Sequence, residues 1–150
     1  MGLTDPEPML ANIHPLLVER IGRVLDAMGI LGYPMKIVQG LRTVAQQQAL
    51  YAKGRTEPGP IVTNADGVRI PSFHQARTDG LGHAVDCAFV GPEPFAEHWP
   101  WHVYGACVKV VGLTWGGEFK ARPGFPAGPD RPHAELHLAQ LSQKSSTLLA

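Results

Sequence analysis

Residues 72–90, with the sequence SFHQARTDGLGHAVDCAFV, join a polar loop to a strongly apolar segment. The first half of this stretch is polar, whereas the half from Ala84 to Val90 contains the small and β-branched residues that are typical of a buried strand. Asp86 lies inside this apolar half. Because a charge that enters a core must be paired or bound to a metal ion, the pattern favours a metal ligand here, with a hydrogen-bonded structural aspartate as the alternative. His74, in the preceding loop, offers an imidazole to the same site.

Hydrophobic spacing predicts the elements around this strand. Apolar residues recur every three or four positions over residues 13–28, which indicates a helix with one buried face. Thr43 is a suitable N-cap for a second helix that ends at Gly54, and Pro100 suits the first turn of a third helix that ends at Gly112. Further short strands are expected at residues 35–38, 113–115 and 134–138, and a loop at residues 55–71.

These elements predict an α+β fold. Two or three helices are expected to pack on a small, mainly antiparallel sheet, with the metal site on the open face of that sheet. The length of 150 residues suits a single domain over residues 1–150. We expect the motif-bearing core at residues 40–138 and a frayed tail at about residues 142–150.

The charge balance argues against polyanionic partners. Thirteen basic and thirteen acidic residues cancel, so we expect no nucleic-acid partner. No apolar stretch approaches the ~20 residues of a membrane span, so no membrane insertion is expected either. The acidic N-terminus lacks the features of a secretory signal, which predicts synthesis in a bacterial cytoplasm. We expect a monomer, and we expect Cys87 and Cys107 to be small apolar residues rather than a disulfide.

A second chemical cluster, Asp130-Arg-Pro-His133-Ala-Glu135-Leu-His137, brings two acids and two histidines into eight residues. If the chain is extended after Pro132, the side chains of His133, Glu135 and His137 lie on one face. A carboxylate three positions before a ligand histidine can then reach a water molecule on the metal. A surface strand with solvated acids is the alternative.

Taken together, these motifs resemble a known family: the zinc peptidases that comprise D-alanyl-D-alanine carboxypeptidases and L-alanyl-D-glutamate endopeptidases, including many phage endolysins. The resemblance spans residues 40–135, about two thirds of the chain. It rests on a Gly-Leu-Arg-Thr segment at residues 40–43, a Ser-x-His motif at 72–74, a Gly-x-Ala-x-Asp motif at 82–86, a Thr-Trp-Gly-Gly segment at 114–117 and an Asp-x-Pro-His motif at 130–133. Their joint presence in this order makes the resemblance specific.

The resemblance implies a role for each matching residue. It implies a Zn²⁺ ion on His74, Asp86 and His133, with Asp130 as the catalytic base and Arg42 as the group that binds a substrate carboxylate or polarises the scissile carbonyl. A guanidinium is well suited to planar recognition of a carboxylate. The resemblance also implies substrate-binding roles for Gln47, Ser72 and Trp115, although Trp115 could equally be a core tryptophan.

One departure from the family pattern concerns the first ligand. Five additional residues separate His74 from Gly82, and the usual spacing counted back from Asp86 ends on Asp79. Two registers are thus open, with His74 favoured because its Ser-Phe-His signature is intact and imidazole suits zinc better than a second carboxylate. The inserted segment, residues 75–79, could line the cleft and alter specificity.

The function that these implications favour is hydrolysis of peptidoglycan stem peptides by a phage-type endolysin that cuts the L-Ala-D-Glu bond. We expect such an enzyme to act on the cell wall after release from the cytoplasm. A D-Ala-D-Ala carboxypeptidase is the first alternative. A non-catalytic, zinc-containing cell-wall-binding module or a phage structural component is the second, and the altered spacing before Asp86 is the argument for it.

Overall fold

A computed structural model describes residues 8–139, and within this range it contains three α-helices and one four-stranded sheet. The predicted tail at residues 142–150 lies outside the described residues. Every pair of neighbouring strands is antiparallel, in the order β1-β2-β4-β3, so the predicted α+β class is confirmed. The helices are α1 (Pro15–Ile30), α2 (Val44–Ala52) and α3 (Trp101–Val110), and the strands are β1 (Met35–Gln39), β2 (Ala84–Phe89), β3 (Thr114–Trp115) and β4 (His133–Glu135), with short 3-10 turns η1 (Pro8–Leu10) and η2 (Gly116–Glu118).

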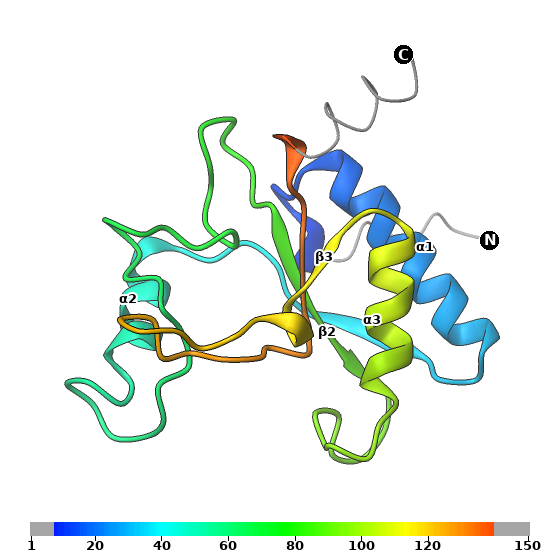
Figure 1. Cartoon of the computed structure of the whole chain (residues 1–150). Coiled ribbons are helices and arrows are strands. Elements are labelled where there is room, and N and C mark those ends of the chain that lie inside the picture. The colour runs from blue at the N-terminus through cyan, green and yellow to red at the C-terminus, as the bar shows by residue number, and fades with distance from the viewer. Residues whose placement is uncertain (1–7, 140–150) are drawn as a thin grey trace, which may run out of the picture.

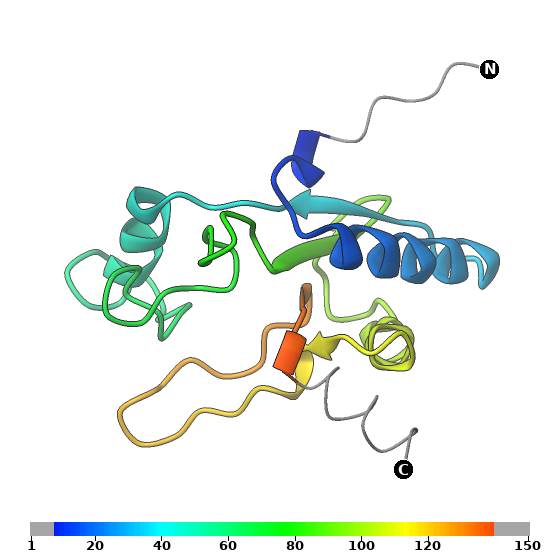
Figure 2. The ribbon, with the colours of Figure 1, turned by 90° about the horizontal axis from the view of Figure 1, so that it is seen from above.

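The hydrophobic core lies between the sheet and two of the helices. Figure 1 shows α1 and α3 together on one side, and α2 with the long loops on the other. Val85, Cys87 and Phe89 alternate along β2 and belong to the core, together with buried residues of α1 and α3. Viewed from above, the same two helices lie away from α2 and its loops (Figure 2). Within residues 8–139, no helix combines the length and apolar character of a membrane crossing.

The opposite face of the sheet carries the polar residues. Asp86 pairs with His133 across β2 and β4, and Ala84 pairs with Glu135. Since the core residues of β2 alternate with these positions, the side chains of Asp86, His133 and Glu135 all belong to the open face. The sheet therefore places the sequence's two chemical motifs side by side.

The ends of several elements differ from the predicted ones. Helix α1 continues two residues past the predicted end at residue 28, because Gly29 stays helical and the stop comes at Gly32, which has a φ of 90°. Strand β4 ends at Glu135 rather than at residue 138. Glu135 lies opposite Ala84, the first residue of β2, so no strand residue of β2 remains for a longer ladder. Helix α2 begins as predicted, with a capping box between Thr43 and Gln46.

Candidate metal centre

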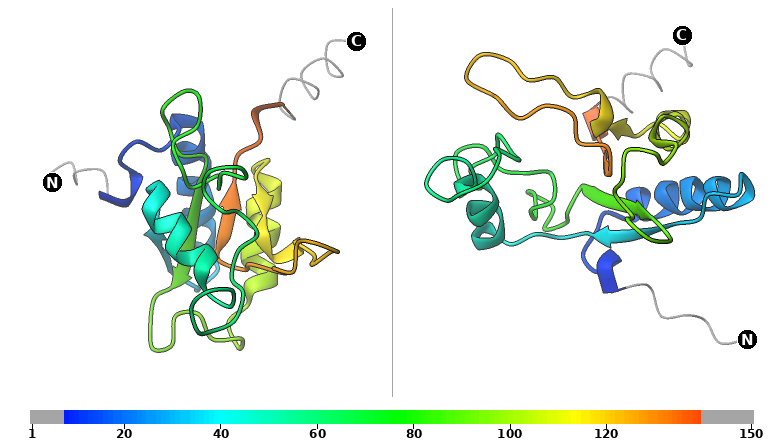
Figure 3. Two further views of the ribbon diagram at one scale, coloured as in Figure 1. Left: turned by 90° about the vertical axis from the view of Figure 1, so that its left-hand side faces the viewer. Right: turned by 90° about the horizontal axis from the view of Figure 1, so that it is seen from below.

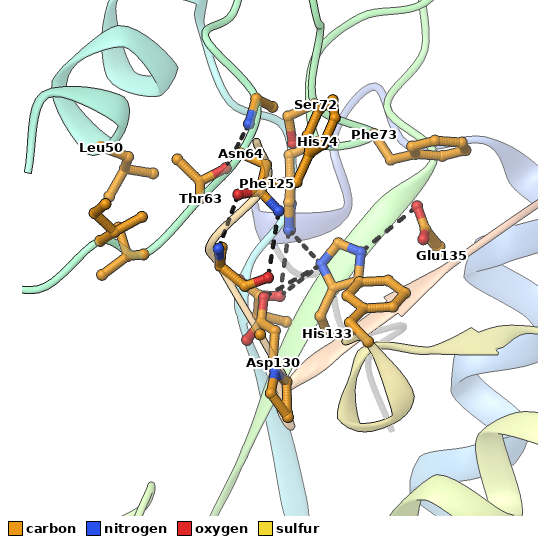
Figure 4. Close-up of a pocket in the computed structure, with 18 of the residues that line it drawn as sticks. Leu50, Thr63, Asn64, Ser72, Phe73, His74, Phe125, Asp130, His133 and Glu135 are labelled. Carbon is orange, nitrogen blue, oxygen red and sulfur yellow. Dashed lines mark hydrogen bonds and ion pairs between the residues drawn. The ribbon is translucent and has the colours of Figure 1, made fainter. Parts of the chain in front are cut away.

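Three donor atoms converge on the open face of the sheet. The Nε2 atom of His74 lies 3.1 Å from Nδ1 of His133 and 3.2 Å from Oδ1 of Asp86. The His133 Nδ1 atom lies 3.3 Å from the same carboxylate oxygen. Figure 4 shows the ring of His74 directed at that of His133, with a dashed line between their nitrogen atoms. The structure thus brings together the three residues for which the motifs imply metal binding.

The geometry of these atoms fits a metal ion. Ligands about 2.0–2.1 Å from a tetrahedral zinc ion lie about 3.3 Å from one another, and the three separations match that edge length. The Oδ1 atom of Asp86 is buried and has no hydrogen-bond partner, a costly state unless a cation satisfies it. Two imidazole nitrogens and one carboxylate oxygen also form a donor set typical of catalytic zinc.

Each imidazole has a partner on its other nitrogen. The Nδ1 atom of His74 lies 2.9 Å from the carbonyl oxygen of Gly40, which accepts its proton and leaves a lone pair on Nε2. The Nε2 atom of His133 lies 3.7 Å from Oε2 of Glu135, which is itself buried. Both lone pairs are therefore directed into the space between the three donors.

The turn that carries His133 is shaped by a close approach of the backbone. A Cβ atom on Gly116 would lie only 2.3 Å from the carbonyl oxygen of Asp130 and 2.7 Å from Cβ of His133. The amide of Asp130 also donates to the Gly116 carbonyl. The Tyr104 hydroxyl donates to the carbonyl of Pro132, so the turn is held from the side of α3 as well.

The structure places His74, and not Asp79, beside Asp86 and His133. Asp79 does not join the cluster, because its Oδ2 atom lies 2.7 Å from Nε2 of His83 and its Oδ1 accepts from the Leu81 amide. The inserted residues 75–79 thus form a turn beside the site, and neither Arg77 nor Asp79 lines the cleft.

The close contact between Asp86 and the two histidines shifts the pKa values of Asp86 and His133 in opposite directions. Burial raises the pKa of Asp86, but His133 and His74 outweigh it and hold that pKa well below its usual range. Burial lowers the pKa of His133, yet Asp86 and Glu135 outweigh it and raise this pKa to about 10. The metal-free cluster therefore keeps a proton on His133, and a metal ion would replace that proton.

This exchange predicts a pH dependence of stability. In the metal-free protein, the His133 pKa is raised above its unfolded value of about 6.5. The contribution of His133 to the free energy of unfolding is therefore complete below about pH 6.5 and is lost as the pH rises to about 10. After chelation, the melting temperature should therefore fall as the pH rises from 6 to 10. With metal present, it should stay nearly constant over the same range. Parallel curves in the two states would contradict this assignment.

Asp130 and Arg42 flank the cluster. The Oδ2 atom of Asp130 lies 3.9 Å from Nδ1 of His133, and its side chain is 49% exposed. Partial burial and the charge of Asp86 raise the pKa of Asp130, which suits a group that must accept and release a proton. Arg42 is 9% exposed, and its Nη2 atom lies 3.8 Å from Oδ2 of Asp86.

The three predicted substrate-binding residues lie in different places. Ser72 lines the cleft, and its hydroxyl accepts a hydrogen bond from the His74 amide. Gln47 is fully buried behind Arg42 rather than on the cleft surface. Trp115 packs against the core, outside the lining of the cleft, and its indole donates to the carbonyl of Arg131. It thus supports the turn before His133.

A cleft of about 1100 Å³ opens above the cluster. One side is the first cleft loop (residues 53–73), and the other is the second cleft loop (residues 119–130). Figure 3 shows these two loops projecting on the same side of the sheet. The side chain of Asn64 joins them, because its amide accepts from the Ala127 N–H and donates to the Ala127 carbonyl. Sequence reasoning did not find this contact, since it joins positions 63 residues apart.

Comparisons with known proteins find similarity to peptidoglycan peptidases. No family model matches the chain. The chain is 28% identical, over 79% of its length and 74% of the relative, to the peptidoglycan L-alanyl-D-glutamate endopeptidase CwlK of Bacillus subtilis (strain 168). Its fold is similar to that of the L-Ala D-Glu endopeptidase ChiX of Serratia marcescens, with a TM-score of 0.55 and 22% identity over 90% of this chain and 88% of that one.

Two further solved structures share the fold. The LD-carboxypeptidase LdcB gives a TM-score of 0.60 at 14% identity, over 93% of this chain and 73% of that one. The D,D-dipeptidase VanXYg gives 0.56 at 14% identity, over 89% of this chain and 55% of that one. The chain is thus a small α+β domain with a candidate metal centre, and its fold is that of known peptidoglycan peptidases. The chain is a relative of the peptidoglycan peptidases, and the resemblance to their family is confirmed.

Proposed function

We propose that this chain is a zinc-dependent peptidase that hydrolyses the L-Ala-D-Glu bond of peptidoglycan stem peptides. The observation that carries the proposal is the convergence of His74, Asp86 and His133 beside Asp130, in a relative of an endopeptidase of that specificity. Zinc is the preferred metal because two imidazoles and one carboxylate leave a fourth position for water. When bound, zinc supplies Lewis-acid activation of water and of the scissile carbonyl.

The residues of the chain provide the remaining steps. Asp130 takes a proton from the attacking water and passes it to the leaving amine, as expected for a carboxylate whose pKa is raised beside the site. Arg42 stabilises the negative charge that develops on the substrate. The two cleft loops hold the peptide over the cluster.

The choice of bond separates this proposal from its first alternative. CwlK supports an endopeptidase, whereas the LD-carboxypeptidase LdcB and the D,D-dipeptidase VanXYg share only the fold, each at 14% identity. Incubation of purified protein with muropeptides, followed by mass spectrometry, distinguishes the two activities. An endopeptidase releases a new amino terminus at D-Glu, whereas a carboxypeptidase releases free D-Ala. Wall binding without any cleavage would favour a non-catalytic module instead.

The biological setting is also a proposal. The motif resemblance supports a phage-type endolysin that is made in the bacterial cytoplasm and acts on the cell wall after release. Addition of the protein to permeabilised cells should then cause lysis that a chelator prevents. If the turbidity of the cell suspension stays unchanged although the protein cleaves purified peptidoglycan, the lytic role is wrong and the peptidase activity stands.

The charge of the cleft supports an acidic peptide as the substrate. Lys53, Lys120 and Arg122 line the cleft and are exposed. Among the described residues none of the three forms an ion pair, although the Arg122 guanidinium lies over the ring of Phe125. Away from the cluster, the lining of the cleft thus carries positive charge that a stem-peptide carboxylate can neutralise.

This charge predicts a preference that can be measured. Lys120→Ala with Arg122→Gln should raise KM about two- to tenfold for peptides with free carboxylates, as expected for exposed ion pairs. The effect should shrink at high salt and for amidated peptides. The control is Lys36→Ala with Arg23→Gln, which removes the same charge outside the cleft lining. Equal KM values for the two double variants would contradict the prediction.

A further inference from the structure

The guanidinium of Arg42 is held by two neutral amides. Its Nη1 atom donates to Oε1 of Gln47, and its Nη2 atom donates to Oε1 of Gln39, each at 2.6 Å. The Nε atom is buried and has no hydrogen-bond partner. Arg42 also lines the cleft, so this side chain is both fixed in place and in contact with the space that a substrate would occupy.

Neither glutamine side chain neutralises the charge of Arg42. Buried arginines are usually paired with carboxylates, because a buried charge is costly without a counter-charge. Here the near carboxylate is Asp86, at 3.8 Å, and that group already faces His74 and His133. The positive charge of Arg42 is therefore held in position by hydrogen bonds and remains available to a ligand.

Two separate features of the fold bring the amides to this position. Met35 and Ile37 of β1 belong to the core, so simple alternation would direct Gln39 to the core as well. A register shift between Ile37 and Gln39 instead pairs Gln39 with Asp86, a residue of the open face. Such a bulge redirects a side chain at the cost of one irregular ladder position.

The second amide is oriented by its own contacts. The side-chain nitrogen of Gln47 donates to Oγ1 of Thr63 and to the carbonyl of Ala65, both in the first cleft loop. Since the nitrogen is used in this way, the Oε1 atom is directed to Arg42. Gln47 is fully buried, so this orientation is held by the surrounding protein.

We propose that Gln39 and Gln47 are positioning residues that fix Arg42 by hydrogen bonds without adding a counter-charge of their own, so that Arg42 can bind an anionic oxygen of the substrate. This inference rests on the proposed peptidase function. The anionic oxygen is either a stem-peptide carboxylate, present before reaction, or the oxyanion that develops at the scissile carbonyl. Amides are required at both positions because a carboxylate would neutralise Arg42.

The test compares two changes at one position. Gln39→Glu keeps the shape of the side chain and adds a counter-charge for Arg42, whereas Gln39→Met removes the hydrogen bond without adding charge. Gln39→Glu should lower kcat/KM at least tenfold and leave the melting temperature equal or higher. Gln39→Met should lower kcat/KM less than Gln39→Glu does. Metal content is measured in each variant to exclude an effect through the cluster.

The kinetic split identifies the anionic oxygen. A rise in KM indicates a ground-state carboxylate, and a fall in kcat at constant KM indicates the oxyanion. A Gln39→Glu variant with wild-type kcat/KM would overturn the inference, and so would equal losses in Gln39→Glu and Gln39→Met.

A binding measurement separates this inference from the proposed function. Calorimetric titration with the dipeptide L-alanyl-D-glutamate, whose carboxylates need no catalysis to bind, should give weaker binding to Gln39→Glu than to the wild type where Arg42 binds a carboxylate, and equal binding where it acts only on the oxyanion. If the wild type cleaves no peptide but shows this difference, the inference stands and the proposed activity is wrong. If the wild type cleaves and the variant is unaffected in both assays, the inference is wrong.

Discussion

Replacement of Asp130 by asparagine should lower kcat by about 10²–10⁴-fold, which is the usual range for loss of a general base. Asparagine has the shape of aspartate but cannot hold the proton of the attacking water. The half-exposed side chain of Asp130 lies 3.9 Å from Nδ1 of His133, outside the group of three converging donors. Metal content and melting temperature should therefore be almost unchanged.

The control for this variant is Glu118→Gln. Glu118 is an exposed carboxylate that pairs with Lys109 and does not line the cleft, so its loss should leave kcat unchanged. Steady-state kinetics on a purified muropeptide, with metal analysis of each protein, provides the measurement. An Asp130→Asn variant with wild-type kcat would show that another group takes the proton.

Loss of an imidazole from the cluster should have the second large effect. His74→Ala should lower metal affinity more than about 100-fold and abolish peptidase activity, since loss of a group that only hydrogen-bonds a ligand already lowers metal affinity or activity by about 10–100-fold. The Nε2 atom of His74 is one of the three converging donors, and the cavity left by alanine offers no replacement.

Asp79→Ala is the matched control, because Asp79 is the residue that the usual family spacing would select. Its carboxylate contacts His83 and the Leu81 amide rather than the cluster. This variant should bind metal as the wild type does. Isothermal titration with zinc compares the two variants, and the opposite order of affinities would assign the ligand to Asp79.

The strand that decides the fold could be predicted because its signal is local. The apolar run around Asp86 indicates a buried strand whatever the rest of the chain does, and the antiparallel pairing with His133 then brings two motifs together. The helices were predicted for the same reason, since caps such as Thr43 depend on residues within one turn. Their ends were less certain because a glycine can either stop a helix, as Gly32 does, or remain within it, as Gly29 does.

Features that depend on tertiary contacts could not be predicted in this way. The position of Gln39 follows from a register shift in β1, and periodicity alone places it on the core face. The burial of Gln47 behind Arg42 and the packing of Trp115 under the Arg131 carbonyl depend on loops that meet only in the fold. A motif can identify such residues as important without showing that they act by supporting others.

We propose that peptide hydrolysis depends on a metal ion held by His74, Asp86 and His133. The most direct test removes the metal with a chelator, adds back one equivalent of zinc, and identifies the products from peptidoglycan by mass spectrometry. We expect new amino termini at D-Glu in the zinc-loaded protein, none after chelation, and a zinc stoichiometry near one that is lost in His74→Ala. New termini at an unchanged rate in the chelated protein, or none in the zinc-loaded protein, would contradict this proposal.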